Sequence, residues 1–95
     1  MPAHRRQREE WLDEFLDGLE AQGISQVWLY RVLPTGEYKF VTSGGPPSKF
    51  SEQYVQVTYG GGDYMVRSKL NGRWFRSKSF SVEAPRTSLK RSYAY

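Results

Sequence analysis

The sequence predicts a single α+β domain in which two helix–hairpin units form a four-stranded, mostly antiparallel sheet with both helices on one face. Three observations predict it: an amphipathic helical pattern ending at a glycine, two turn signals between alternating residues, and the order helix, hairpin, helix, hairpin. With 95 residues and no cysteine, the chain has the length of one small domain and offers neither a disulfide nor a thiolate metal site.

The first expected element is an amphipathic helix over residues 9–21. Its apolar side chains recur at helical spacing: Trp11, Leu12, Phe15, Leu16 and Leu19. Its carboxylates take the other side: Glu10, Asp13, Glu14, Asp17 and Glu20. Gly23 follows at the position where glycine commonly ends a helix. No second acidic cluster completes a site, so the acidic face predicts a solvated surface that could also meet a basic region of another copy.

The first hairpin is expected next. Residues 24–33 are rich in β-branched and aromatic side chains, and Pro34-Thr35-Gly36 has turn chemistry. In residues 37–42, Tyr38 and Phe40 alternate with Lys39 and Val41, as in a strand. Residues 43–48 are a connector rich in glycine and proline, which can continue neither a helix nor a strand.

Residues 50–59 allow two interpretations. Ser51 could cap a short helix that ends at Gly60, but Val55, Val57 and Tyr59 also alternate as they would in a strand. We favour the helix because its start signal, its stop signal and its length agree.

The second hairpin is expected over residues 64–70 and 73–82. Its turn, Asn71-Gly72, is the strongest short hairpin signal, since both central turn residues need positive φ. The single domain therefore covers residues 9–83, and its halves, 9–42 and 50–83, suggest a degenerate duplication. Residues 1–8 and 84–95 are expected to be flexible basic ends.

The glycine triplet Gly60-Gly61-Gly62 could suggest a phosphate-binding loop. It lacks the lysine and the Ser or Thr of a P-loop, and it precedes a strand instead of opening a helix. It therefore predicts a helix stop followed by a chain reversal.

The charge of the chain is polarised. Its net charge is +4, but residues 64–95 carry eight lysines and arginines against the single acid Glu83. Such asymmetry favours an anionic partner or head-to-tail contact with the acidic helix of another copy.

The basic second hairpin is the candidate nucleic-acid-binding site. Alternation puts Met65, Arg67 and Lys69 on one strand face, where cations could contact phosphates while an indole stacks on an unpaired base. The candidate binding residues are Arg67, Lys69, Arg73, Trp74, Arg76 and Lys78. Tail contacts could come from Arg86, Lys90 and Arg91, and neutral phosphate contacts from Ser68, Ser77 and Ser79. An ordinary solvated sheet face would also carry lysines and arginines, so both interpretations stay open.

Trp28 and Tyr30 alternate with Val27, Leu29 and Leu33, so large apolar groups occupy both faces of the first strand. One set belongs to the core. The other set, Trp28 and Tyr30, either thickens the core or forms an oligomer interface.

The stretch FSEQYV-x-x-x-YGGGDYMVR, followed by NGRWFRSKSFSV, resembles a pattern in small uncharacterised proteins of bacterial viruses and mobile elements. The resemblance covers about residues 49–83. It implies a short helix, a GGG-x-Y reversal and a hairpin, and it implies a viral or mobile-element origin without adding catalytic residues.

The function that these patterns predict is a small basic accessory protein that binds nucleic acid, DNA or RNA, and forms homo-oligomers. The alternative is a self-assembling structural protein, such as a minor virion component or an adaptor. No catalytic triad, paired buried carboxylates or metal-ligand spacing is present, and His4 is the only histidine. We therefore expect no enzyme activity, cofactor, metal, small-molecule substrate or membrane span, and a location in the cytoplasm or within a virion.

Overall fold

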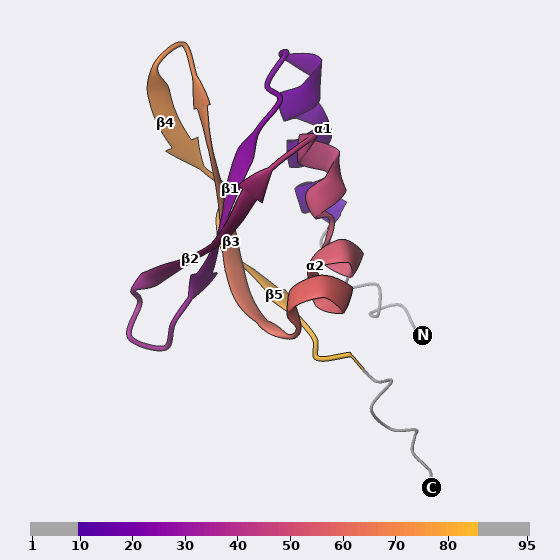
Figure 1. The fold of residues 1–95 in the computed structure, drawn as a ribbon, viewed down its shortest axis with the longest axis vertical. Coiled ribbons are helices and arrows are strands. Elements are labelled where there is room, and N and C mark those ends of the chain that lie inside the picture. Colours follow the sequence, from indigo (N-terminus) through magenta and orange to yellow (C-terminus); the bar gives the residue numbers. More distant parts are fainter. Residues whose placement is uncertain (1–9, 86–95) are drawn as a thin grey trace, which may run out of the picture.

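The computed structural model describes residues 10–85 (Figure 1). The first unit comprises α1 (Glu10–Ala21), β1 (Val27–Val32) and β2 (Tyr38–Gly44). The second comprises η2 (Pro47–Phe50), α2 (Glu52–Tyr59), β3 (Gly62–Leu70), β4 (Arg73–Arg76) and β5 (Phe80–Val82). The predicted α+β fold is confirmed, with five strands in place of four. The expected flexible ends lie outside the described residues, apart from Ala84 and Pro85. The candidate tail contacts Arg86, Lys90 and Arg91 lie outside them as well.

The sheet has the strand order β2-β1-β3-β4, and β5 also pairs with β3. All of these pairings are antiparallel. The first strand of each unit lies in the centre, and its hairpin partner flanks it. Both helices cover one face of the sheet, while the tips of the two hairpins project on the other side (Figure 1). The face opposite the helices is called the open face below.

Local sequence signals explain both helices. In α1 the chain turns after Ala21, where Gly23 has a φ of 85° and the Ile24 N–H donates to the Leu19 carbonyl at 3.0 Å. In α2 the Ser51 Oγ accepts a hydrogen bond of 3.3 Å from the Tyr54 N–H. The segment that could have been helix or strand is therefore a helix.

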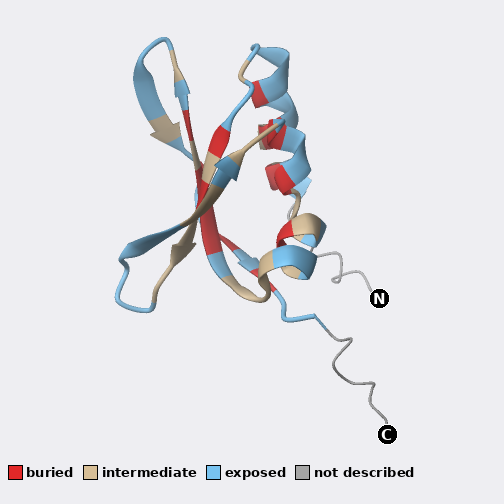
Figure 2. Cartoon of the chain, in the orientation of Figure 1, coloured by how far each residue is buried: buried red, intermediate tan, exposed pale blue. Residues whose placement is uncertain are grey.

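The core lies between the helices and the two central strands (Figure 2). Its buried apolar side chains include Leu12, Leu16, Leu19, Val27, Leu29, Phe50, Val55, Tyr64, Val66, Phe80 and Val82. The first helix also packs on the end of the chain, because the rings of Trp11 and Phe80 lie 6.2 Å apart. Phe15 and Phe75 make a similar edge contact at 6.4 Å. The core therefore contains side chains from both units.

The second hairpin contains an irregularity between β4 and β5. Asn71 and Gly72 form the turn with φ values of 53° and 81°. Arg67 pairs with Arg76, but Tyr64 pairs with Phe80, so the outer strand holds one extra residue. The buried Ser77 fills the gap, since its N–H donates to the Val66 carbonyl at 2.8 Å and its Oγ accepts from the Val66 N–H at 3.0 Å.

The glycine triplet is a chain reversal, and its carbonyl groups are occupied by protein donors. Gly60 ends α2 with a φ of 93°. The Arg31 guanidinium donates to the carbonyls of Gly61 at 3.0 Å and Tyr59 at 3.3 Å. The Tyr64 hydroxyl donates to the Gly60 carbonyl at 2.8 Å. A cation at the C-terminal end of a helix is electrostatically favourable, so the site favours a guanidinium over a phosphate.

Candidate nucleic-acid interface

The open face gathers four of the six predicted hairpin residues. Arg67 and Lys69 lie on it because they alternate with the core residues of β3. The register of β4 sets Arg76 opposite Arg67 and Trp74 opposite Lys69, so these side chains share the same face. The two predicted interface residues, Trp28 and Tyr30, lie on this face as well, since they alternate with the buried Val27 and Leu29.

Arg67 joins the two predicted sites into one surface. Its guanidinium carbon lies 4.5 Å from the ring centroid of Trp74 and 5.6 Å from that of Tyr30. One of its nitrogens donates to the Tyr30 hydroxyl at 3.5 Å. A half-buried guanidinium between two rings has few orientations left, so its charge stays at the centre of the open face.

Trp74 is a supported but accessible ring. The Trp28 ring meets it edge-on, with centroids 4.9 Å apart and an interplanar angle of 68°. Trp74 nevertheless keeps 45% of its surface exposed, and the Lys69 Nζ lies 5.2 Å from its centroid. A hollow of about 210 Å³ lies beside it, lined by Arg67, Trp74, Phe75 and Arg76. Trp74 thus presents a fixed aromatic surface next to positive charge.

Tyr38 and Phe40 extend the open face onto β2, and the sequence reasoning did not include them in the site. They expose 48% and 54% of their surfaces. The Phe40 ring lies 5.7 Å from that of Tyr30, and the Arg76 guanidinium carbon lies 5.8 Å from the Tyr38 centroid. The alternation in residues 37–42 already put both rings on one face, but it could not show that the β4 cations share it.

Two candidate residues do not lie on the open face. The Lys78 Nζ lies 4.8 Å from the ring of Trp11 on α1, because the extra residue after β4 turns Lys78 toward the helices. Alternation sets Arg73 on the face opposite to Trp74, in register with Leu70. The six candidate binding residues are therefore divided, because Arg73 and Lys78 lie apart from the four on the open face.

Two of the serines proposed for phosphate contacts are structural. Ser68 and Ser77 are buried. The Ser68 hydroxyl donates to the Gln26 carbonyl at 3.0 Å, and the Ser77 hydroxyl donates to the Lys78 carbonyl at 2.8 Å. Their hydrogen-bonding groups face the protein interior, so they are not placed to contact a phosphate.

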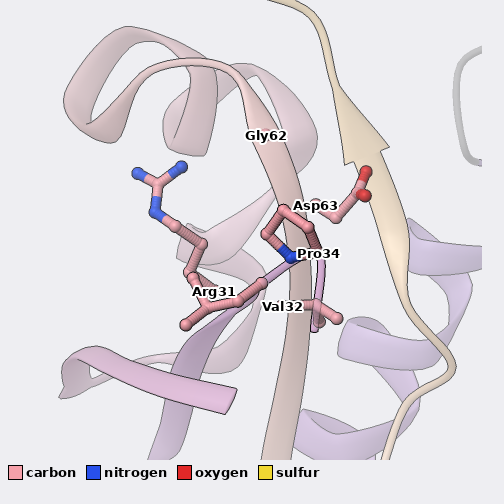
Figure 3. A pocket seen from close by; sticks show the side chains of 6 residues that line it. Arg31, Val32, Pro34, Gly62 and Asp63 are labelled. Carbon is pink, nitrogen blue, oxygen red and sulfur yellow. The ribbon is translucent and has the colours of Figure 1, made fainter. Parts of the chain in front are cut away.

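A hollow of about 340 Å³ lies at the turn between β1 and β2, and Arg31, Val32, Leu33, Pro34, Gly62 and Asp63 line it (Figure 3). The side chains of Arg31 and Asp63 point away from each other. Arg31 donates to the carbonyls of Tyr59 and Gly61, and Asp63 accepts a hydrogen bond of 2.8 Å from the Ser81 hydroxyl. Both charged groups are thus engaged by the protein itself.

Within residues 10–85, no group of three or more His, Cys, Asp or Glu side chains is placed to hold a metal ion. None of the helices in the same residues has the length and apolar character needed to cross a bilayer.

The open face is therefore the candidate site that the geometry supports: a fixed central guanidinium, two exposed cations and accessible aromatic rings on one sheet surface. Comparison of the chain with known proteins gave no matching protein-family model, no matching curated protein and no matching solved structure.

Proposed function

We propose that this chain is a small, non-enzymatic nucleic-acid-binding protein that contacts its ligand through the open face. The observation that carries the proposal is the position of Arg67 between Trp74 and Tyr30, with Lys69 and Arg76 beside it. Cations can neutralise phosphates there, while ring surfaces stack on bases.

The charge distribution supports the proposal. Residues 64–95 hold eight basic side chains and one acid, whereas an ordinary solvated surface mixes both signs. Arg86, Lys90 and Arg91 would add phosphate contacts in this proposal. The resemblance of residues 49–83 to proteins of bacterial viruses and mobile elements favours an accessory role beside a viral or mobile genome, in the cytoplasm or in a virion.

The test is a titration of fluorescently labelled oligonucleotides at two salt concentrations. We expect binding that weakens as salt rises, because phosphate contacts release counterions. Two variants with equal changes of charge separate the faces. Lys69→Glu with Arg76→Glu reverses two cations of the open face, and Lys39→Glu with Arg73→Glu reverses two cations on the other side of the same sheet.

We expect the first pair to lower the affinity at least tenfold more than the second. If both pairs weaken binding equally, the affinity depends on the net charge of the protein alone. The open face would then not be the binding surface. If the unaltered chain binds no oligonucleotide at low salt, the whole proposal is wrong.

Self-assembly is the second candidate function. It is favoured by one observation: Tyr38, Phe40 and Trp74 expose about half of their surfaces on a single face. The exposed carboxylates of α1 offer a complementary charge for head-to-tail contact with the basic hairpin of another copy. Light scattering over a concentration series tests it, and a strict monomer at high micromolar concentration would exclude it.

A further inference from the structure

We infer, resting on the proposed function, that the open face takes single-stranded nucleic acid in preference to a duplex and stacks unpaired bases at two places. The tryptophan station consists of Trp74 with Trp28 behind it. The tyrosine–phenylalanine station consists of Tyr38 and Phe40 with Tyr30 behind Phe40.

The exposed groups of the face suit unpaired bases. Three rings, Trp74, Tyr38 and Phe40, are each about half exposed, and each lies beside a supporting ring or cation. In a duplex the base surfaces are stacked on each other, so only an unpaired base can use such rings. The faces of these rings form no hydrogen bonds with a phosphate, so their exposure favours stacking on a base.

The exposed cations of the open face are few compared with its aromatic rings. Within residues 10–85, Lys69 and Arg76 are the exposed cations that we assign to the open face, because Arg67 is held between two rings. A duplex-binding protein can make about six to ten phosphate contacts. The basic residues of the tail would add charge contacts to either ligand, so the preference for unpaired bases comes from the stacking rings of the face.

The cations that lie over the exposed rings can give way to a base. Lys69 lies 5.2 Å from the Trp74 centroid, and Arg76 lies 5.8 Å from the Tyr38 centroid. An exposed cation–π contact is worth roughly two- to fivefold in an equilibrium constant. Stacking of one base is worth roughly five- to 150-fold, so a base displaces the cation, which is then free to meet the neighbouring phosphate.

The spacing of the stations fits a strand of several nucleotides. In the sheet order, two strands separate Trp74 on β4 from Phe40 on β2. Trp74 lies in register with Lys69 of β3, and Phe40 lies in register with Met65 of β3 through Tyr30 on β1. The Trp74 ring is linked to the Phe40 ring through Arg67 and Tyr30 by successive distances of 4.5, 5.6 and 5.7 Å, so the two rings lie at most about 16 Å apart. Both hairpin tips project on the side of the open face (Figure 1). A bound strand would therefore run diagonally across the centre of the open face, where Arg67 lies between the two stations.

The experiment measures fluorescence anisotropy with a labelled mixed-sequence DNA strand of about a dozen nucleotides, its duplex, and the RNA strand of the same sequence. The protein is the full chain. We expect either single strand to bind at least tenfold more tightly than the duplex at the same salt concentration. Whichever single strand binds more tightly identifies the preferred sugar, and both results support the inference.

Three variants locate the stations. Trp74→Ala and Phe40→Ala should each weaken single-strand binding about tenfold while the duplex affinity changes less than twofold. Trp74→Phe keeps a ring and should recover part of the loss. Val57→Ala is the control, because Val57 is 72% exposed on α2, on the helix-covered side. Denaturation midpoints of all variants show whether each one is folded.

The possible failures are distinct. Equal or tighter duplex binding would overturn the inference and leave the proposed function intact. Unchanged single-strand affinity in folded Trp74→Ala and Phe40→Ala would also overturn it, even if the charge reversals weaken binding. If those variants abolish a concentration-dependent dimer instead, the face belongs to a second copy. Absence of all binding would remove the inference together with the proposed function.

Discussion

The guanidinium carbon of Arg76 lies 5.8 Å from the ring centroid of Tyr38, although their strands are the two ends of the sheet order. Met65 lies on the same open face of the sheet. Its side chain is fully buried although it faces away from the helices. The register places Met65 beside Tyr30, on the diagonal between Arg76 and Tyr38. The contact therefore spans the open face near the register position of Met65, and we expect it to contribute to the burial of that side chain.

Arg76→Ala should expose Met65 to oxidation. Truncation removes the cover on one side, so dilute peroxide should convert Met65 to its sulfoxide several-fold faster than in the unaltered chain. Peptide mass spectrometry measures the rate, and Met1, the other methionine, is the internal reference. Arg73→Ala, on the opposite face of β4, is the matched control. An unchanged rate for Met65 in Arg76→Ala would show that other groups bury it.

Arg31→Ala should destabilise the domain by about 2–3 kcal/mol. The variant loses charge-assisted hydrogen bonds to the carbonyl end of α2 and the contact of the guanidinium with the Tyr64 ring at 4.8 Å. Arg31→Lys keeps the charge but not the two-pronged geometry, so it should recover only part of the loss. Urea denaturation measures both.

Lys39→Ala is the control for Arg31, since Lys39 pairs with Arg31 across the hairpin but is exposed. It should change the free energy of unfolding by less than about 0.5 kcal/mol. A similar loss in Lys39→Ala and Arg31→Ala would mean that capping of α2 is not the source.

Glu20 should make stability depend on pH in the acid range. Hydrogen bonds from the Ser48 hydroxyl at 2.5 Å and the Ser48 N–H at 2.8 Å lower the pKa of Glu20 from its ordinary value of 4.5. A carboxyl whose pKa is lower in the folded state stabilises the fold above its unfolded pKa, and this contribution is lost as the pH falls through the folded pKa.

The measurement compares Glu20→Gln with the unaltered chain in urea at neutral pH and at successively lower pH. We expect the variant to be less stable at neutral pH and the difference to vanish under strongly acidic conditions. Asp17→Asn, an exposed carboxylate on the same helix, should show a smaller difference. A Glu20 difference that grows as the pH falls would contradict the assignment.

Gly61→Ala and Gly18→Ala should change stability in opposite directions. A Cβ at Gly61 would lie 2.7 Å from the backbone nitrogen of Ala84, so the chain after β5 must shift, at a cost of about 1–3 kcal/mol. A Cβ at Gly18 meets nothing within 4 Å and lies in α1, where alanine should add about 0.5–1 kcal/mol. Thermal unfolding measures both, and loss of stability in both variants would contradict this.

The sequence predicted the elements because local chemistry determines them. The apolar spacing of residues 9–21 with Gly23 located α1, and Asn71-Gly72 located the second hairpin within a residue or two. For residues 50–59, Ser51 and Gly60 predicted a helix correctly, although the alternating residues also allowed a strand. The reason is that both helix ends need partners for their unpaired backbone groups, and these two residues suit such ends. The proposed duplication and the flexible ends stay predictions.

Only part of the candidate site could be predicted from the sequence. Alternation identified Arg67 and Lys69, but the single extra residue at Ser77 changes which face Lys78 takes, and no local signal marks it. Tyr38 and Phe40 joined the site through the strand order, which depends on pairings between distant segments. The role of Arg31 did leave a trace, namely a lone cation within the apolar run from Val27 to Leu33.

The packing of the first helix on the end of the chain has a consequence for biosynthesis. Trp11 and Phe15 leave the ribosome before their partners Phe80 and Phe75 are made. The apolar side of α1 thus lacks these partners until the second unit has been synthesised. Because such long-range contacts form only when both ends are available, the native core completes its assembly after β5 has left the exit tunnel.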